Sequence, residues 1–187
     1  RAVGRFMFEA EDAAADGGRD ELKNGAAGAE PVIPESGKVL VLKGAPASAV
    51  YAMAVRSVLD TGRPAILVDG GCQVDPYRVA EVAKALGCTR KDIEGLLRKI
   101  LVARAFTAHQ LEALVVERLE PETRRSRAAF AGVLDIDALF MDEQLDGYEA
   151  RIMKARCLRR LRAMAKDCRI PVVVTEGSDR KHSRWGW

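Results

Sequence analysis

One loop of this chain has the setting of a site that binds a nucleoside triphosphate. The run Gly44-Ala45-Pro46-Ala47-Ser48-Ala49-Val50-Tyr51 follows an extended apolar run and precedes an apolar helical pattern. The loop G-x-x-x-x-G-K-[ST] occupies that setting, and its lysine and hydroxyl hold the phosphates and Mg²⁺. The first glycine is present as Gly44, but Ala49, Val50 and Tyr51 replace the second glycine, the lysine and the hydroxyl residue. We therefore expect a loop that keeps the shape of a nucleotide site without its chemistry.

Gly44 and Ser48 are the residues of this loop that we predict to take part in a weak or vestigial nucleotide site.

Five apolar runs predict the strands that would carry these residues. They are Val39–Leu42, Ala65–Asp69, Ile100–Arg104, Ala129–Ile136 and Pro171–Thr175. Most of them are continuous rather than alternating, which is typical of strands buried on both faces of a parallel sheet. Helical patterns separate them. The chain therefore predicts an α/β fold, a three-layer, doubly wound and mostly parallel sheet of about five strands.

Capping residues predict where two of the helices begin. Asp75 is a candidate N-cap with Pro76 at the first helical position. Thr107, with Gln110 three residues later, predicts a capping box, and that helix is expected to stop before Pro121.

A long helix is predicted over residues 147–166. The side chains expected to face the core are Ile152, Ala155, Leu158, Leu161 and Met164. The same segment is rich in arginine and lysine, which fits a solvated face or a charged surface for a partner.

Composition predicts one soluble domain with distinct ends. The chain has 187 residues, a net charge of +3, and four cysteines without C-x-x-C spacing, so we expect no zinc site, no disulfide framework and a cytoplasmic location. Residues 1–30 are acidic and rich in Ala and Gly, and we expect a flexible extension. Residues 31–177 form the predicted core, and residues 178–187 form a basic, aromatic tail. The tail residues Arg180, Lys181, Arg184 and Trp185 can hold single-stranded DNA by phosphate contacts and base stacking, and the alternative is a solvated or partner-docked tail.

Several segments occur in an order that indicates a family. Leu67–Gly87 is a strand that ends in an acidic turn before a Pro-led helix, and the next strand continues into Ala103-Arg104-Ala105-Phe106 and then His109-Gln110. Val133–Leu139 and Pro171–Thr175 follow as later core strands. Together these segments resemble the ATPase core of the RecA/RadA recombinase superfamily, in particular its archaeal and eukaryotic recombinase-paralog branch. The resemblance covers roughly residues 31–177.

The resemblance implies a RecA-like P-loop NTPase core with a catalytic glutamate after the second strand and a polar sensor after the fifth. Gly71 and Gly177 stand at those positions, in addition to the changes at Val50 and Tyr51. By the same resemblance, Asp135 or Asp137 would be the Walker B carboxylate that holds Mg²⁺ through water, or a cap of the following turn. The predicted weak or vestigial nucleotide site thus comprises Gly44, Ser48 and Asp137. We therefore expect no ATP hydrolysis and no bound cofactor. By analogy with the family, the chain would be an accessory protein of DNA recombination or repair. It would bind a recombinase or repair protein, and also single-stranded DNA, without contacting a membrane.

Two alternatives remain open from the sequence. The chain can be an atypical ATP-binding protein that holds ATP and Mg²⁺ with Asp137 and a displaced lysine, Lys38 or Lys43. It can also be a structural or regulatory domain with no role in DNA metabolism. Arg104 fits either a contact to a nucleotide or neighbouring subunit, or a buried pair with an Asp or Glu.

Overall fold

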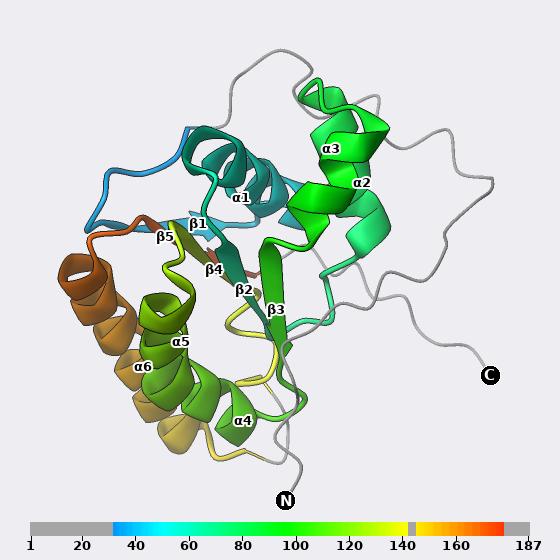
Figure 1. The fold of residues 1–187 in the computed structure, drawn as a ribbon. Coiled ribbons are helices and arrows are strands. Elements are labelled where there is room, and N and C mark those ends of the chain that lie inside the picture. Colours follow the sequence, from blue (N-terminus) through cyan, green and yellow to red (C-terminus); the bar gives the residue numbers. More distant parts are fainter. Residues whose placement is uncertain (1–31, 142–144, 178–187) are drawn as a thin grey trace, which may run out of the picture.

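Five parallel strands form a single sheet in the order β1-β5-β4-β2-β3 (Figure 1). Neighbouring strands pair in parallel throughout. Their bounds are β1 (Val39–Lys43), β2 (Ala65–Asp69), β3 (Ile100–Arg104), β4 (Phe130–Leu134) and β5 (Val172–Glu176). The predicted α/β fold is confirmed, and the arrangement is consistent with a three-layer RecA-like core.

The structure, a computed structural model, describes residues 32–141 and 145–177. The predicted N-terminal extension lies outside these residues, and so does the basic tail with Arg180, Lys181, Arg184 and Trp185. Among the described residues, no helix has both the length and the apolar character needed to cross a membrane.

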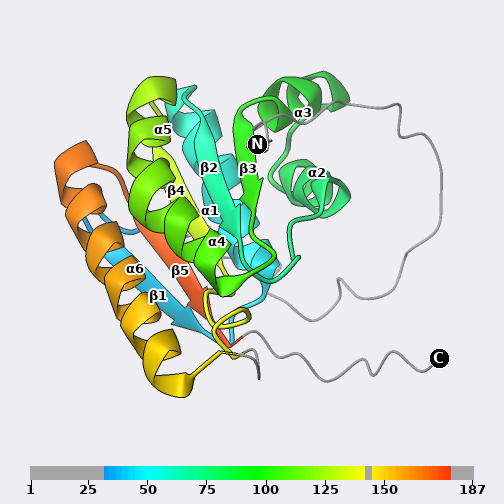
Figure 2. The same cartoon turned by 90° about the horizontal axis from the view of Figure 1, so that it is seen from below.

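Helices cover both faces of the sheet (Figure 2). One face packs against α1 (Ala47–Thr61), α2 (Pro76–Ala85) and α3 (Arg90–Leu97). The other face packs against α4 (Ala108–Ala113), a π-helical segment η2 (Leu114–Arg118), α5 (Leu119–Ser126) and α6 (Gly147–Cys168).

Two apolar cores result from the alternation of side chains along each strand. On β2, Ala65 and Leu67 face the layer of α1, whereas Ile66 and Val68 face the layer of α6. All four are buried, which is why this strand has a continuous apolar sequence.

The predicted helix starts are confirmed. Asp75 caps α2 by accepting a hydrogen bond from the backbone N–H of Tyr77 at 2.9 Å, with Pro76 at the first helical position. Thr107 caps α4 by accepting from the N–H of Gln110 at 3.2 Å. The return bond of that capping box differs, because the Gln110 side chain accepts from the N–H of Phe106.

The predicted stop before Pro121 is wrong. α5 includes Pro121 as its third residue and continues to Ser126. A proline inside a helix lacks an N–H and collides with the carbonyl four residues earlier. Here the widened π-helical turn η2 and the φ of −105° at Arg118 precede it, so the regular α-helical bonding is already interrupted.

The inward face of α6 is rotated from the predicted one. Leu161 and Met164 are buried as predicted, but Ala155 is exposed. The remaining inward positions belong to Ala150, Met153, Cys157 and Ala165. Alanines and a cysteine at these positions give a weaker apolar signal in the sequence than Ile152 and Leu158. These two residues are only partly buried, at the border of the inward face of α6.

Gly132 on β4 gives a test of the packing between the sheet and α1. A Cβ at Gly132 would lie 2.8 Å from both Leu67 Cδ2 and Val50 Cγ1, two side chains with no exposed surface. We expect Gly132→Ala to lower the free energy of unfolding by about 1–3 kcal/mol, measured by urea denaturation.

Gly95 is the matched control for that change, because an added Cβ meets nothing within 4 Å on the exposed side of α3. Gly95→Ala should stabilise the protein by about 0.5–1 kcal/mol. Equal effects of the two substitutions would contradict tight packing at Gly132.

Candidate functional site

The carboxyl ends of the strands lie at one edge of the sheet, called the carboxyl edge below. From this edge the chain leaves β2 toward α2 on one face, and leaves β3 and β4 toward α4 and α6 on the other. Ligands of open α/β sheets bind where neighbouring strands diverge in this way. The carboxyl edge of the sheet is therefore the candidate site.

The loop after β1 is too short for a phosphate-binding loop. Gly44, Ala45 and Pro46 alone separate Lys43 at the end of β1 from Ala47 at the start of α1. The second half of the eight-residue run, from Ala47 to Tyr51, is helical. The prediction that the loop keeps the shape of a nucleotide site is therefore wrong.

The loop glycine turns the chain directly into the helix. Gly44 has a φ of +63°, and its N–H donates to the backbone oxygen of Glu176 at 2.9 Å. Ser48 is exposed in the first turn of α1. These two predicted site residues thus lie at the carboxyl edge, but they form no cradle of converging N–H groups.

The residues at the lysine and hydroxyl positions face the core. Val50 and Tyr51 have no exposed surface. The Tyr51 hydroxyl donates to the backbone oxygen of Gln73 and accepts from the N–H of Asp75 at 3.3 Å. Tyr51 therefore connects α1 to the turn after β2, and it cannot reach a ligand in solvent.

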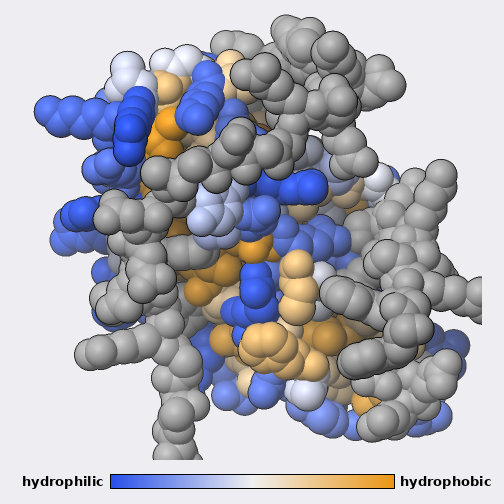
Figure 3. All heavy atoms as spheres, turned by 90° about the vertical axis from the view of Figure 1, so that its right-hand side faces the viewer, coloured by the Kyte–Doolittle hydropathy of each residue, from blue (hydrophilic) through white to orange (hydrophobic). Residues whose placement is uncertain are grey.

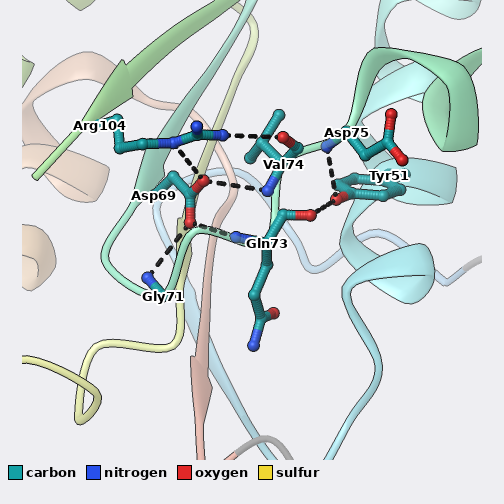
Figure 4. A network of polar contacts seen from close by, with 7 residues as sticks. All are labelled: Tyr51, Asp69, Gly71, Gln73, Val74, Asp75 and Arg104. Carbon is teal, nitrogen blue, oxygen red and sulfur yellow. Dashed lines mark hydrogen bonds and ion pairs between the residues drawn. The ribbon is translucent and has the colours of Figure 1, made fainter. Parts of the chain in front are cut away.

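Asp69, the last residue of β2, is the centre of this turn (Figure 4). Its carboxylate is fully buried and accepts from three backbone N–H groups, those of Gly71 at 3.2 Å and of Gln73 and Val74 at 2.9 Å each. The turn after β2 is therefore wrapped around its own aspartate.

Arg104 completes the environment of Asp69. Its Nε lies 3.0 Å from Asp69 Oδ2, and its Nη2 donates to the backbone oxygen of Val74 at 2.8 Å. The expected pairing of Arg104 with an acidic residue is confirmed, but only the Asp69 side of the pair is buried, because the Arg104 side chain is 39% exposed. Arg104 is the last residue of β3, so this ion pair also joins the ends of two neighbouring strands.

The two aspartates after β4 have separate environments. Asp135 is 3% exposed, its N–H donates to Thr175 Oγ1 at 2.7 Å, and its Oδ2 accepts from Gln73 Nε2 at 3.0 Å. Asp137 is half-buried and forms an ion pair with Lys154 of α6 at 2.6 Å. Glu176 at the end of β5 contacts the same ammonium at 3.1 Å.

Lys154 thus places a positive charge between two carboxylates at the carboxyl edge. Partial burial alone would lower the pKa of Lys154, but hydrogen bonds to Asp137 and Glu176 outweigh this effect and raise it. The ammonium is charged at neutral pH. Asp137 therefore already has a cationic partner at the position where it was predicted to hold Mg²⁺.

The structure links two of the three predicted nucleotide-binding residues. Gly44 bonds to Glu176, which shares Lys154 with Asp137. Ser48 is not part of this chain of contacts. Lys43 is exposed at the carboxyl edge, whereas Lys38 precedes β1 at the opposite end, about 16 Å away for five residues of strand. Lys38 therefore cannot serve a site at the carboxyl edge.

Sequence reasoning missed Lys154 and Glu176 as parts of this edge. Lys154 belongs to a helix with many cations, and nothing in its local sequence separates it from those in solvent. A usable signal was its position four residues after Ala150 and three before Cys157, beside the buried stripe of α6.

The residues at this edge do not fit the ATP–Mg²⁺ site of a P-loop enzyme. The cradle is absent, the lysine position is buried, and Asp137 is paired with Lys154. Within the described ranges, no group of three or more His, Cys, Asp or Glu residues is arranged to hold a metal ion. In comparisons with known proteins, no family model and no curated protein matches this chain.

The hydrogen bonds between Tyr51 and the turn after β2 can be tested by mutation. Tyr51→Phe removes the hydroxyl that bonds to Gln73 and Asp75, and we expect the free energy of unfolding to fall by about 1–2 kcal/mol in urea denaturation. Tyr77→Phe is the control, because Tyr77 is 66% exposed and should cost little.

The same tyrosine predicts a pH dependence. Burial raises the pKa of Tyr51 from 10.0 to about 12. Its contribution to stability is complete below pH 10 and is lost as the pH rises toward about 12, because the unfolded chain releases the proton first. Phenolate absorbance should therefore show one late-titrating tyrosine that is missing in Tyr51→Phe; a wild-type protein whose tyrosines all titrate near 10 would contradict this.

Proposed function

We propose that this chain is a RecA-like core that does not hydrolyse ATP and that serves as an accessory protein in DNA recombination or repair. It binds a recombinase or repair protein through its folded surface. The absence of ATP hydrolysis is supported by one observation: side chains of the protein itself occupy the carboxyl edge. Tyr51 fills the lysine–hydroxyl region, Arg104 neutralises Asp69, and Lys154 neutralises Asp137.

The charge balance at this edge supports the absence of nucleotide chemistry. Phosphoryl transfer needs cations directed at the phosphates and carboxylates available for Mg²⁺. Here Arg104 and Lys154 are directed at carboxylates. To bind Mg²⁺, Asp137 would have to give up its ion pair in a half-buried site, and Lys154 would keep only Glu176 as a partner.

Exposed apolar side chains support the second part, binding of a protein partner. Phe106 follows β3 and is 67% exposed, and Tyr77 at the start of α2 is 66% exposed. Figure 3 shows hydrophobic surface between hydrophilic residues on the side of the molecule that faces right in Figure 1. Exposed aromatic residues are enriched in protein interfaces. The assignment to recombination or repair rests on the family resemblance alone.

Calorimetric titration with a non-hydrolysable ATP analogue and Mg²⁺ tests the loss of nucleotide binding. We expect no binding heat at high protein concentration. The competing proposal, an atypical ATP site, predicts saturable heat that is lost in Asp137→Asn and in Lys43→Gln. Saturable binding by the wild-type chain would overturn our proposal, and the two variants would then locate the site.

As a further part of this function, residues 178–187 would contact single-stranded DNA, as their basic and aromatic composition predicts. Deleting these residues tests this contact. We expect the full chain to bind a labelled oligonucleotide in fluorescence anisotropy, and the affinity to fall with added salt because phosphate contacts release counterions. The deletion should weaken binding by about tenfold, a loss that corresponds to two or three phosphate contacts. Binding that is unchanged by the deletion would exclude the tail as the DNA contact.

A further inference from the structure

A basic residue precedes every strand of the sheet. These residues lie at the amino ends of the strands, called the amino edge below, opposite to the candidate site. They are Lys38 before β1, Arg63 before β2, Arg98 and Lys99 before β3, Arg127 before β4, and Arg169 before β5.

The strand register places these cations in a row. Ala65 pairs with Ile100, so Arg63 and Arg98, each two residues earlier, lie at the same level. Ala65 also pairs with Phe130, and Ala131 pairs with Val172, so Arg127 and Arg169 lie within about one residue of that level on the next two strands. With about 4.8 Å between strands, the row across five strands is about 19 Å long.

Part of this charge has a structural explanation. The helices α1, α3, α5 and α6 end at the amino edge, and cations stabilise the carbonyl ends of helices. Arg63 serves in this way, because it donates to the backbone oxygens of Arg127 at 2.7 Å and Ala128 at 3.1 Å. The other cations of the row are exposed and, among residues 32–141 and 145–177, form no ion pair.

Two of these arginines occupy positions that normally favour glycine. Arg127 ends α5 with a φ of 55°, and Arg169 ends α6 with a φ of 52°. A residue with a Cβ is disfavoured in this left-handed conformation, which is why glycine is the commonest residue there. The end of α1, by contrast, has Gly62 with a φ of 66°. A purely structural cap would therefore be better served by glycine at both arginine positions.

A surface cavity lies within the row. It has a volume of about 350 Å³ and is lined by Arg63, Arg124, Arg127, Asp167 and Cys168, together with Thr123 and Ala128. Arg124 is paired with Glu120 at 2.9 Å, so Arg63 and Arg127 face Asp167 with a surplus of one positive charge. Burial raises the pKa of the Cys168 thiol, so the thiol stays neutral and does not offset this charge.

We propose that the amino edge binds the phosphate backbone of nucleic acid. Arginine is suited to phosphate because its planar guanidinium offers several donors. At one phosphate per 3.4 Å of each strand, the 19 Å row faces about five or six phosphates. A single small anion would use only part of such a row. This site goes beyond the proposed function, in which DNA contact comes from residues 178–187 after β5.

An anionic membrane is the other surface that carries phosphates. Helices that lie on membranes present a row of large apolar side chains beside their cations. In this chain the exposed Tyr77, Phe106, Met141 and Tyr148 follow the carboxyl ends of β2, β3 and β4. Leu59 near the end of α1 and Val32 before β1 are the other exposed large apolar residues of the described ranges. Four of the six therefore lie at the edge opposite to the cationic row, which favours nucleic acid.

The double variant Arg127→Gly/Arg169→Gly tests the proposal without endangering the fold. Glycine is favoured at both positions, so the melting temperature should stay the same or rise. We expect the affinity for a fluorescein-labelled DNA duplex, measured by anisotropy on the full chain, to fall at least about tenfold at about 0.1 M salt. The slope of log K against log salt should become less negative by about 1.8, or 0.9 for each of two lost phosphate contacts.

Lys43→Gln/Arg78→Gln is the matched control, because it removes the same charge from exposed residues at the carboxyl edge. It should leave the affinity within about twofold. The proposal is overturned if the wild-type chain does not bind the duplex at low salt, or if the double glycine variant binds as tightly as wild type. It is also overturned if both double variants weaken binding equally, or if the glycine variant loses binding only to phosphatidylserine vesicles.

Deletion of residues 178–187 separates this site from the proposed tail contact. If the deletion leaves duplex binding unchanged and the double glycine variant abolishes it, the amino edge is the binding surface and the tail contact fails. The reverse result removes the amino-edge site and leaves the proposed function standing.

Discussion

The buried carboxylate of Asp69 is the interaction on which the carboxyl edge depends. An ionised group without exposed surface needs several hydrogen bonds and an opposite charge to be tolerated. The chain supplies the hydrogen bonds by folding residues 71–74 around the carboxylate, and Arg104 supplies the charge from β3. This requirement fixes the turn after β2, the start of α2 and the end of β3 at once. The surrounding residues are therefore positioned by an internal anion.

Other polar groups along the carboxyl edge are likewise paired with groups of the protein itself. Tyr51 bonds to the turn that Asp69 organises, and the short loop after Gly44 lets α1 approach that turn. On the other side, Lys154 takes the place of a cation between Asp137 and Glu176. Each of these contacts satisfies a polar group that an open site would leave for substrate or metal. Val50 and Gly71 are buried, whereas Gly177 is exposed and an added Cβ there would meet nothing within 4 Å.

The sequence predicted the strands well because each is a largely apolar run, and the bounds of β2 and β3 match the prediction. β2 and β4 are buried on both faces, whereas the edge strands β1 and β3 are partly exposed. The sequence also predicted the caps at Asp75 and Thr107, which depend on neighbouring residues only. The sequence-based prediction failed where contacts between residues far apart in the sequence determine the local structure. Pro121 is accommodated by a π-helical turn upstream, and the inward face of α6 uses small residues. The contacts of Tyr51 and Lys154 join residues that are 17 or more positions apart, and no local pattern encodes them.

The small net charge of +3 conceals a polar distribution of charge. At the carboxyl edge, Asp69 and Asp137 each have a cation as partner, so little charge remains for an anionic ligand such as ATP. At the amino edge, four helices end and their carbonyl dipoles favour cations. Arg63 donates hydrogen bonds to two backbone carbonyls there, and the row holds further exposed arginines beyond Arg63. The proposed amino-edge site rests on this contrast, because the cations available to phosphate are those that form no ion pair within the described residues.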